Sequence, residues 1–170
     1  SKSAFSKARK KLSYKVLESI NREYVKENQI KNTYKGLRLF AIDGTKLTMP
    51  DSRELELIFK KPRNKKSTAY MPQASMVACL DITSNLASEI ELGSYDTSEK
   101  ELALRLLPNI EKGSLVITDR YFGNRFFFYN CEKEELFYLS RMKTGKNAMV
   151  EVKDFINSKT KTAIVEINIK

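Results

Sequence analysis

The stretch Leu115-Val116-Ile117-Thr118-Asp119-Arg120-Tyr121-Phe122 decides how the rest of the chain is interpreted. Its first four residues are apolar or β-branched and follow Gly113, a pattern that indicates a short buried strand rather than a helix. The strand runs into a carboxylate, Asp119. Because chemistry in open α/β sheets gathers at the carboxyl ends of strands, Asp119 is a candidate catalytic residue.

An earlier stretch repeats this arrangement. Leu37–Asp43 (LRLFAID) is also expected to be a strand that ends in a carboxylate, and Gly44 follows it. If the two strands are neighbours, their backbones lie ~4.8 Å apart, so Asp43 and Asp119 could share one divalent cation or bridge two. Each aspartate also has a structural alternative: Asp43 would begin an Asp-Gly turn, and Asp119 would cap the next helix.

Composition narrows the chemistry. The 170 residues fit one domain, or one domain and part of another. A net charge of +10 favours a polyanionic partner such as nucleic acid, although the same charge could serve solubility alone. The chain has no histidine, which excludes His-dependent triads, His-ligated zinc and a His general base. Metal chemistry would therefore use carboxylates, which favours Mg²⁺ or Mn²⁺.

The cellular setting is predicted from three features. Cys79 and Cys131 form no CxxC pair and lie in apolar stretches, so we expect buried thiols in a reducing compartment. No stretch approaches the ~20 apolar residues of a membrane span, and no signal peptide is visible. We therefore expect a cytoplasmic protein without membrane contact.

The order of elements predicts an α/β fold. We expect a mixed sheet in the order β-β-β-α-β-α-β, with helices packed on it, two N-terminal helices before it and more strands after it. Asp81 is expected to be a hairpin-turn residue. The chain ends within the last expected strand, so we expect it to be a piece of a longer protein. The expected helices are two within 1–30 that meet at Ser13, Ser52–Phe59, one that starts after Ser98, and Arg125–Lys133; the expected strands are Leu37–Asp43, Ala74–Leu80, Leu86–Leu92, Leu115–Asp119, Leu136–Met142, Ala148–Lys153 and Thr162–Lys170.

Basic residues supply candidate contacts to DNA. A Pro-interrupted loop carries five cations, which repel one another unless an anion or solvent compensates: Lys60, Lys61, Arg63, Lys65 and Lys66. We expect this loop to contact DNA phosphates, and a merely solvated loop is the alternative. Arg120 and Arg125 are further candidates beside Asp119, since arginine can bind phosphate bidentately. For Arg125 the alternative is a solvent-facing helix residue.

Two motifs resemble those of a known family. Phe40-Ala41-Ile42-Asp43-Gly44-Thr45 and Val116-Ile117-Thr118-Asp119-Arg120-Tyr121-Phe122 resemble the first- and second-aspartate motifs of the DDE transposases of bacterial insertion sequences, of the insertion-sequence-four type. Ser3–Leu12 resembles the family's N-terminal helix pattern. The resemblance implies a ribonuclease H-like core that carries out DNA transposition on double-stranded DNA, at transposon ends and at a target. It also implies that Asp43 and Asp119 are two of three catalytic ligands for two Mg²⁺ (or Mn²⁺) ions.

The third ligand of this family is a glutamate on a helix with spaced Tyr, Arg and Lys, a signature that the chain does not show. We therefore expect it beyond Lys170, with these 170 residues inactive by themselves. The expected organisation is an N-terminal helical segment (1–30), a ribonuclease H-like core (31–143) and the start of a β-rich insertion (144–170). A stand-alone nuclease of this fold and an inactive DNA-binding module are the alternatives. Association with the nucleoid when DNA is bound is expected, and a homodimer of the full-length protein is left open.

Overall fold

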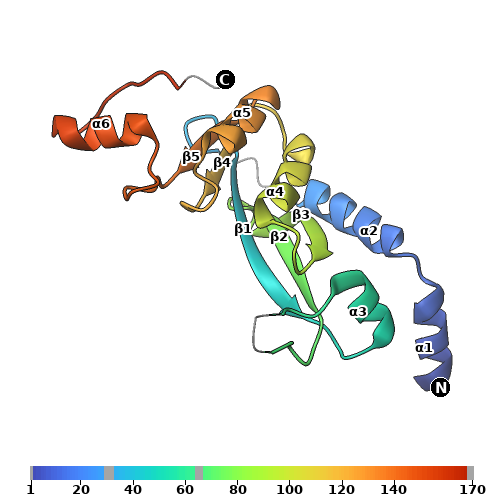
Figure 1. Ribbon diagram of the computed structural model, residues 1–170. Coiled ribbons are helices and arrows are strands. Elements are labelled where there is room, and N and C mark those ends of the chain that lie inside the picture. Colours follow the sequence, from blue (N-terminus) through green and yellow to red (C-terminus); the bar gives the residue numbers. More distant parts are fainter. Residues whose placement is uncertain (1, 29–32, 64–66, 168–170) are drawn as a thin grey trace.

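The computed structural model describes residues 2–28, 33–63 and 67–167 (Figure 1). The helices are α1 (Lys2–Lys11), α2 (Tyr14–Glu27), α3 (Arg53–Phe59), α4 (Glu99–Leu106), the 3₁₀ turn η1 (Leu107–Asn109), α5 (Arg125–Lys133) and α6 (Val150–Ser158). The strands are β1 (Leu39–Thr48), β2 (Gln73–Asp81), β3 (Leu86–Ser94), β4 (Leu115–Thr118) and β5 (Phe137–Ser140).

In the described part of the chain the strands form one five-stranded sheet in the order β3-β2-β1-β4-β5. The first three strands form an antiparallel meander, and β4 and β5 add in parallel on the other side of β1. This strand order, with helices between the parallel strands, is a ribonuclease H-like mixed α/β fold. The predicted fold class is confirmed, including the β2–β3 hairpin, and the structure places β1 at the centre of the sheet.

One face of the sheet carries the core. Val77 and Val116 on this face are completely buried, as are Leu102 and Leu106 of α4. Phe127 of α5 joins the same cluster, and Figure 1 shows α4 and α5 lying against the sheet. The opposite face holds partly exposed apolar side chains on the outer strands, namely Ile90, Leu92, Phe137 and Leu139. Within the described residues, the helices therefore bury one side of the sheet much more than the other.

The two predicted N-terminal helices are confirmed. Ser13 separates them and caps α2, since its hydroxyl accepts a hydrogen bond from the Lys15 N–H at 3.3 Å. The α2 helix lies beside β3, where Arg22 forms an ion pair with Glu89 at 3.3 Å. The side-chain amide of Asn21 donates to the Ala87 carbonyl in the same strand at 3.2 Å. Helix α2 is therefore fixed to the edge of the sheet by polar contacts.

The first strand is longer than predicted. We expected it to end at Asp43, but β1 continues to Thr48 and pairs with β2 along that length. Gly44, which would follow Asp43 in the alternative Asp-Gly turn, lies opposite Val77 in this ladder. The prediction was wrong because a long antiparallel partner keeps the chain extended past a glycine that favours turns by itself.

The prediction for the last part of the chain was also wrong. Ala148–Lys153, expected to be a strand, contributes to helix α6 at the β5 side of the molecule (Figure 1). The alternation that suggested a strand is short, whereas Val152, Phe155 and Ile156 have helical spacing and face the same apolar pocket. Residues 162–167 form no strand, and residues 168–170 lie outside the described part.

Several local predictions hold. Both cysteines are buried and unpaired, and burial raises the pKa of the Cys79 thiol to about 11 and that of Cys131 to about 12. Asp81 is a hairpin-turn residue, because its Oδ1 accepts hydrogen bonds from the N–H groups of Thr83 and Ser84 at 2.9 and 3.3 Å.

In the described ranges, no helix combines the length and the hydropathy needed to cross a bilayer.

Candidate active site

The two candidate aspartates are brought to the same place by the pairing of β1 with β4. These strands are parallel, and their ladder runs from the pair Leu39 and Leu115 to the pair Ile42 and Thr118. The next residue in each strand is the aspartate. Adjacent strands lie ~4.8 Å apart, so the backbones of Asp43 and Asp119 leave the shared ladder side by side. The adjacency on which the sequence interpretation depended is therefore observed.

Neither aspartate has the structural role that was its alternative. The Asp43 Oδ1 accepts a hydrogen bond from the Gly44 N–H at 2.8 Å, but the backbone there is an extended strand and not a turn. The Asp119 Oδ1 accepts from the Tyr121 N–H at 2.8 Å, and Asp119 lies five residues before the cap of α5. The cap is Asn124, which accepts from the Phe127 N–H at 3.1 Å. The fold thus leaves the structural explanations for both aspartates unsupported.

Both carboxylates are exposed, and neither has a counter-ion among the residues that the structure describes. The side chains of Asp43 and Asp119 are exposed to solvent, and no described lysine or arginine forms an ion pair with either. Side chains alternate along a strand, so Asp43 projects from the sheet face opposite that of buried Ile42. The carboxylates are therefore accessible to a ligand on the less covered face of the sheet.

A third acid, Glu99, lies close to this site but on the other face of the sheet. It is the first residue of α4, and its side chain occupies the space where a side chain at position 44 would be. A Cβ built on Gly44 would lie 2.6 Å from the Glu99 Cδ and 2.7 Å from its Oε2. Sequence reasoning missed Glu99, although a glycine inside a strand is a known sign of close approach by another group.

The chemistry of the two aspartates suits a hard divalent cation, since exposed carboxylate oxygens are the ligands that Mg²⁺ and Mn²⁺ prefer. Two carboxylates alone are an incomplete set of ligands for such a cation, however. Among the residues that the structure describes, no three His, Cys, Asp or Glu side chains are arranged to hold a metal ion. Asp43 and Asp119 are thus the described residues that would contribute to such a site.

The loop β4–α5, which carries Asp119, is fastened to the end of β5. The Ser140 hydroxyl donates a hydrogen bond to the Asp119 carbonyl at 3.0 Å. Gly123 is buried against the same segment, and a Cβ there would lie only 3.0 Å from the Arg141 carbonyl oxygen. Glycine is required at this close approach because any side chain would push the two segments apart. The position of Asp119 is therefore set by β4 on one side and β5 on the other.

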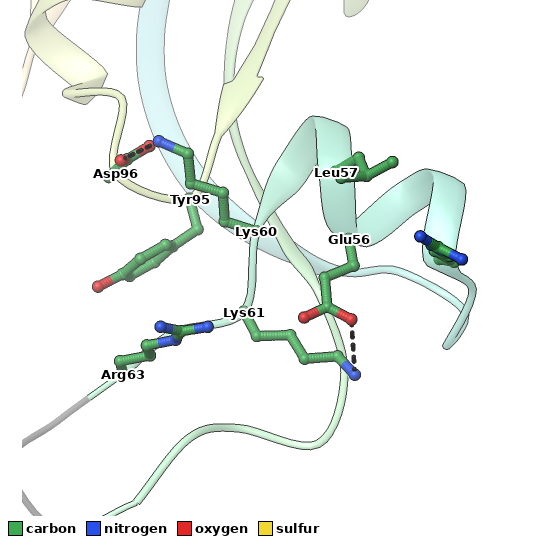
Figure 2. Close-up of a pocket in the computed structure, with 8 residues that line it drawn as sticks. Glu56, Leu57, Lys60, Lys61, Arg63, Tyr95 and Asp96 are labelled. Atoms are coloured by element: carbon green, nitrogen blue, oxygen red, sulfur yellow. Dashed lines mark hydrogen bonds and ion pairs between the residues drawn. The ribbon is translucent and has the colours of Figure 1, made fainter.

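The predicted DNA-binding loop borders a separate pocket of about 740 Å³ beside α3 (Figure 2). Two of its lysines already have acidic partners. Lys60 forms an ion pair with Asp96 at 2.6 Å, and Lys61 pairs with Asp51 at 2.9 Å. Arg63 extends towards Tyr95 across the pocket and has no ion pair among the described residues. Lys65 and Lys66 lie outside the described residues.

The two arginines predicted beside Asp119 differ in their surroundings. Arg120 is exposed and has no ion pair within the described part of the chain. Arg125 donates from its Nη2 to both carboxylate oxygens of Glu151, at 2.6 and 2.8 Å. This hydrogen bond lowers the pKa of the Glu151 carboxyl. Arg125 therefore joins α5 to α6, a role that the sequence did not reveal.

The fold is a ribonuclease H-like mixed α/β fold with two aspartates directly after a shared parallel ladder, and sequence comparison gives the family. Residues 34–169 match the family described as Transposase DDE domain, so the chain belongs to the DDE transposases. The predicted family is confirmed.

Two relatives from Escherichia coli (strain K12) illustrate the similarity. "Transposase InsG for insertion sequence element IS4" is 33% identical over 85 residues, which is 50% of this chain and 19% of the relative. "Putative transposase InsZ" is 29% identical over 127 residues, which is 71% of this chain and 42% of the relative. The chain thus matches less than half the length of either protein.

Proposed function

We propose that this chain contributes the catalytic core of a DNA transposase, which hydrolyses phosphodiester bonds at transposon ends. The freed 3′-hydroxyl then attacks a phosphodiester of another strand and displaces the 3′-oxygen of that strand. The observation that carries this proposal is the parallel pairing of β1 and β4. The ladder stops at Ile42 and Thr118, and the next residues are the exposed carboxylates Asp43 and Asp119. Family membership supports the same assignment.

Asp43 and Asp119 would hold Mg²⁺ or Mn²⁺, two ions in the complete site. A bound pair of such ions activates an attacking oxygen and stabilises the leaving oxygen in phosphodiester displacement. Because no third described acid is arranged with this pair to hold a metal ion, we place the third ligand, a glutamate, outside the described residues. For the same reason we expect the 170 residues alone to bind DNA weakly and to cleave it little.

The cations would hold the DNA backbone. Their present ion pairs indicate how readily each of them can bind a phosphate. Arg63 and Arg120 have no carboxylate partner among the described residues, so phosphate contact costs them no ion pair. Lys60 and Lys61 would have to exchange a carboxylate for a phosphate. Arg125 faces the same exchange with Glu151. Lys65 and Lys66 keep their proposed DNA-binding role on charge alone.

The proposal also covers the DNA partner, the cellular location and the domain organisation. The partner is double-stranded DNA, both transposon ends and target, in the cytoplasm and on the nucleoid, with a homodimer of the full-length protein as one option. The core would comprise residues 31–143, because all strands of the sheet lie between Leu39 and Ser140. Residues 1–30 would form a helical segment, and residues 144–170 would begin an insertion.

The test is strand cleavage by the full-length protein with Mg²⁺ and transposon-end DNA, comparing wild type with Asp119→Asn. This substitution keeps the size of the side chain and removes its charge. We expect cleavage to fall by about 10²–10³-fold, the loss typical of removing one group that stabilises transition-state charge. Asp154→Asn is the matched control, since Asp154 is an exposed residue of α6.

Three outcomes separate the proposal from its rivals. Unchanged cleavage by Asp119→Asn would refute it. Cleavage of generic DNA by the 170 residues alone would favour a stand-alone nuclease. Salt-sensitive DNA binding without any Mg²⁺-dependent cleavage by the full-length protein would favour an inactive DNA-binding module.

A further inference from the structure

The ammonium groups of two lysines lie over the ring of Tyr121, a residue that follows Asp119 by two positions. The Lys100 Nζ lies 4.7 Å from the ring centroid, and the Lys143 Nζ lies 5.8 Å from it. Lys100 belongs to the first turn of α4, Tyr121 to the loop after β4, and Lys143 to the segment after β5. Three elements that are distant in the sequence thus bring two positive charges to one aromatic ring.

This arrangement is built into the fold at the candidate active site. The Tyr121 N–H donates to the Asp119 carboxylate at 2.8 Å, which ties the ring's backbone to the candidate metal ligand. The hydrogen bond from Ser140 to the Asp119 carbonyl and the close approach at Gly123 hold the end of β5 against the same loop. Lys143 follows three residues after Ser140, so this packing carries its side chain to Tyr121.

The charges at this cluster are uncompensated. Within the described ranges, neither Lys100 nor Lys143 forms an ion pair with a carboxylate. Other lysines, such as Lys60 and Lys112, do pair with acids. An aromatic face attracts a cation by about 0.5–1 kcal/mol at exposed sites, but two like charges near one ring repel each other. Arg120, the residue before Tyr121, is exposed and adds a third positive charge to this segment of the chain. An anion bound between these groups would relieve the repulsion.

We propose that Lys100, Tyr121 and Lys143 form a binding site for one phosphate of the DNA backbone, next to the loop that carries Asp119. The inference rests on the proposed function and adds residues to it. Lysine binds phosphate as a mobile point charge, and the ring keeps both ammonium groups close to the site while it is empty of DNA. The site holds the strand next to the reacting phosphate, so that the bond to be cut meets the carboxylates.

The test measures binding of a fluorescent DNA duplex to the protein without divalent metal, as a function of salt concentration. The variant is the double substitution Lys100→Ala with Lys143→Ala. Each duplex phosphate that a protein neutralises contributes about 0.9 to the slope of log K against log salt. We expect the slope of the double variant to be shallower by about that amount, together with weaker binding at every salt concentration.

The control removes the same charge elsewhere. Lys112→Ala with Lys133→Ala changes the net charge equally, but Lys112 pairs with Glu135 at the opposite end of β4. We expect this control to keep the wild-type slope. Equal slopes for the two double variants, or no binding of DNA by the wild type at low salt, would overturn the inference. Neither result depends on strand cleavage, so failure here is distinguishable from failure of the Asp119→Asn test.

Two further experiments test the role of the Tyr121 ring and the identity of the ligand. Tyr121→Phe keeps the aromatic face and should bind DNA as the wild type does, whereas Tyr121→Ala should lose affinity; equal affinities for these two variants would count against the role of the ring. Inorganic phosphate, compared with chloride at equal ionic strength, should not displace the duplex. If phosphate displaces the duplex from the wild type but not from the Lys100→Ala and Lys143→Ala double variant, the site binds free phosphate. That result would overturn the assignment to DNA.

Discussion

Replacing Gly123 by alanine should loosen the contact that positions Asp119. An alanine Cβ at this position would lie 3.0 Å from the Arg141 carbonyl oxygen, 3.1 Å from the Ser140 Oγ and 3.2 Å from the Met142 Sδ. These distances are shorter than the ~3.5–4.0 Å of favourable carbon contacts, and the closest atom belongs to backbone, which cannot turn away. The β4–α5 loop and the end of β5 must therefore separate.

The expected cost is that of inserting one methyl group into a filled site, about 1–3 kcal/mol in the free energy of unfolding. Urea unfolding followed by circular dichroism measures it, with the slope of the transition checked for change. A thermal scan should show a fall of about 2–4 °C for each kcal/mol in a chain of this size.

Gly145→Ala is the matched control for this prediction. Gly145 lies in the same part of the chain, but a Cβ there would meet no atom within 4 Å. Its free energy of unfolding should change by less than about 1 kcal/mol, in either direction. If Gly123→Ala is as stable as wild type, or if both variants lose the same stability, the close approach at Gly123 does not hold the loop and the reasoning fails.

Two other predictions concern charge. Asp81→Ala should cost up to about 3 kcal/mol in the free energy of unfolding, since it removes a buried carboxylate that pairs with Arg38 at 2.6 Å. Arg38 keeps a second partner, Glu111, which lessens the cost. Burial alone would raise the pKa of the Asp81 carboxyl, but hydrogen bonds from Arg38 and from the turn N–H groups outweigh burial and lower it. Its stabilisation is therefore full above the unfolded pKa of about 3.9 and is lost as the pH falls through the lower folded value. Urea midpoints across this acid range should fall for wild type and change less for Asp81→Ala; parallel curves would contradict the assignment. In DNA-binding titrations, Arg63→Ala should weaken affinity more than Lys60→Ala, because Lys60 gives up an ion pair with Asp96 to reach phosphate; the reverse order would contradict this.

Local signals were enough for much of the fold. The sequence predicts helices that begin at Ser52 and after Ser98, and the hydroxyls of these serines cap them by accepting hydrogen bonds from the N–H groups of Leu55 and Lys100, both at 3.2 Å. The hairpin around Asp81 and the strand before Asp119 were likewise predicted within a residue or two. These features depend on a few consecutive residues, so their physical causes are present in the sequence itself.

Long-range pairing overruled local preference elsewhere. Gly44 favours a turn by itself, yet β2 keeps β1 extended through it. The residues from Met149 onwards alternate like a strand, yet helical spacing places Val152 and Phe155 in the apolar pocket beside β5. In both cases the burial and hydrogen bonds supplied by a distant partner exceed the small propensity of the local segment.

The sequence by itself determined which residues are candidates: two acids after apolar strands, a chain without histidine, and an excess of positive charge. Only the tertiary structure decided that Asp43 and Asp119 leave one ladder together, and which cations already have partners. Lys60 and Lys100 look alike in the sequence, but one pairs with Asp96 and the other lies over Tyr121. The availability of a charge depends on neighbours that the fold brings from elsewhere in the chain, and no local pattern contains that information.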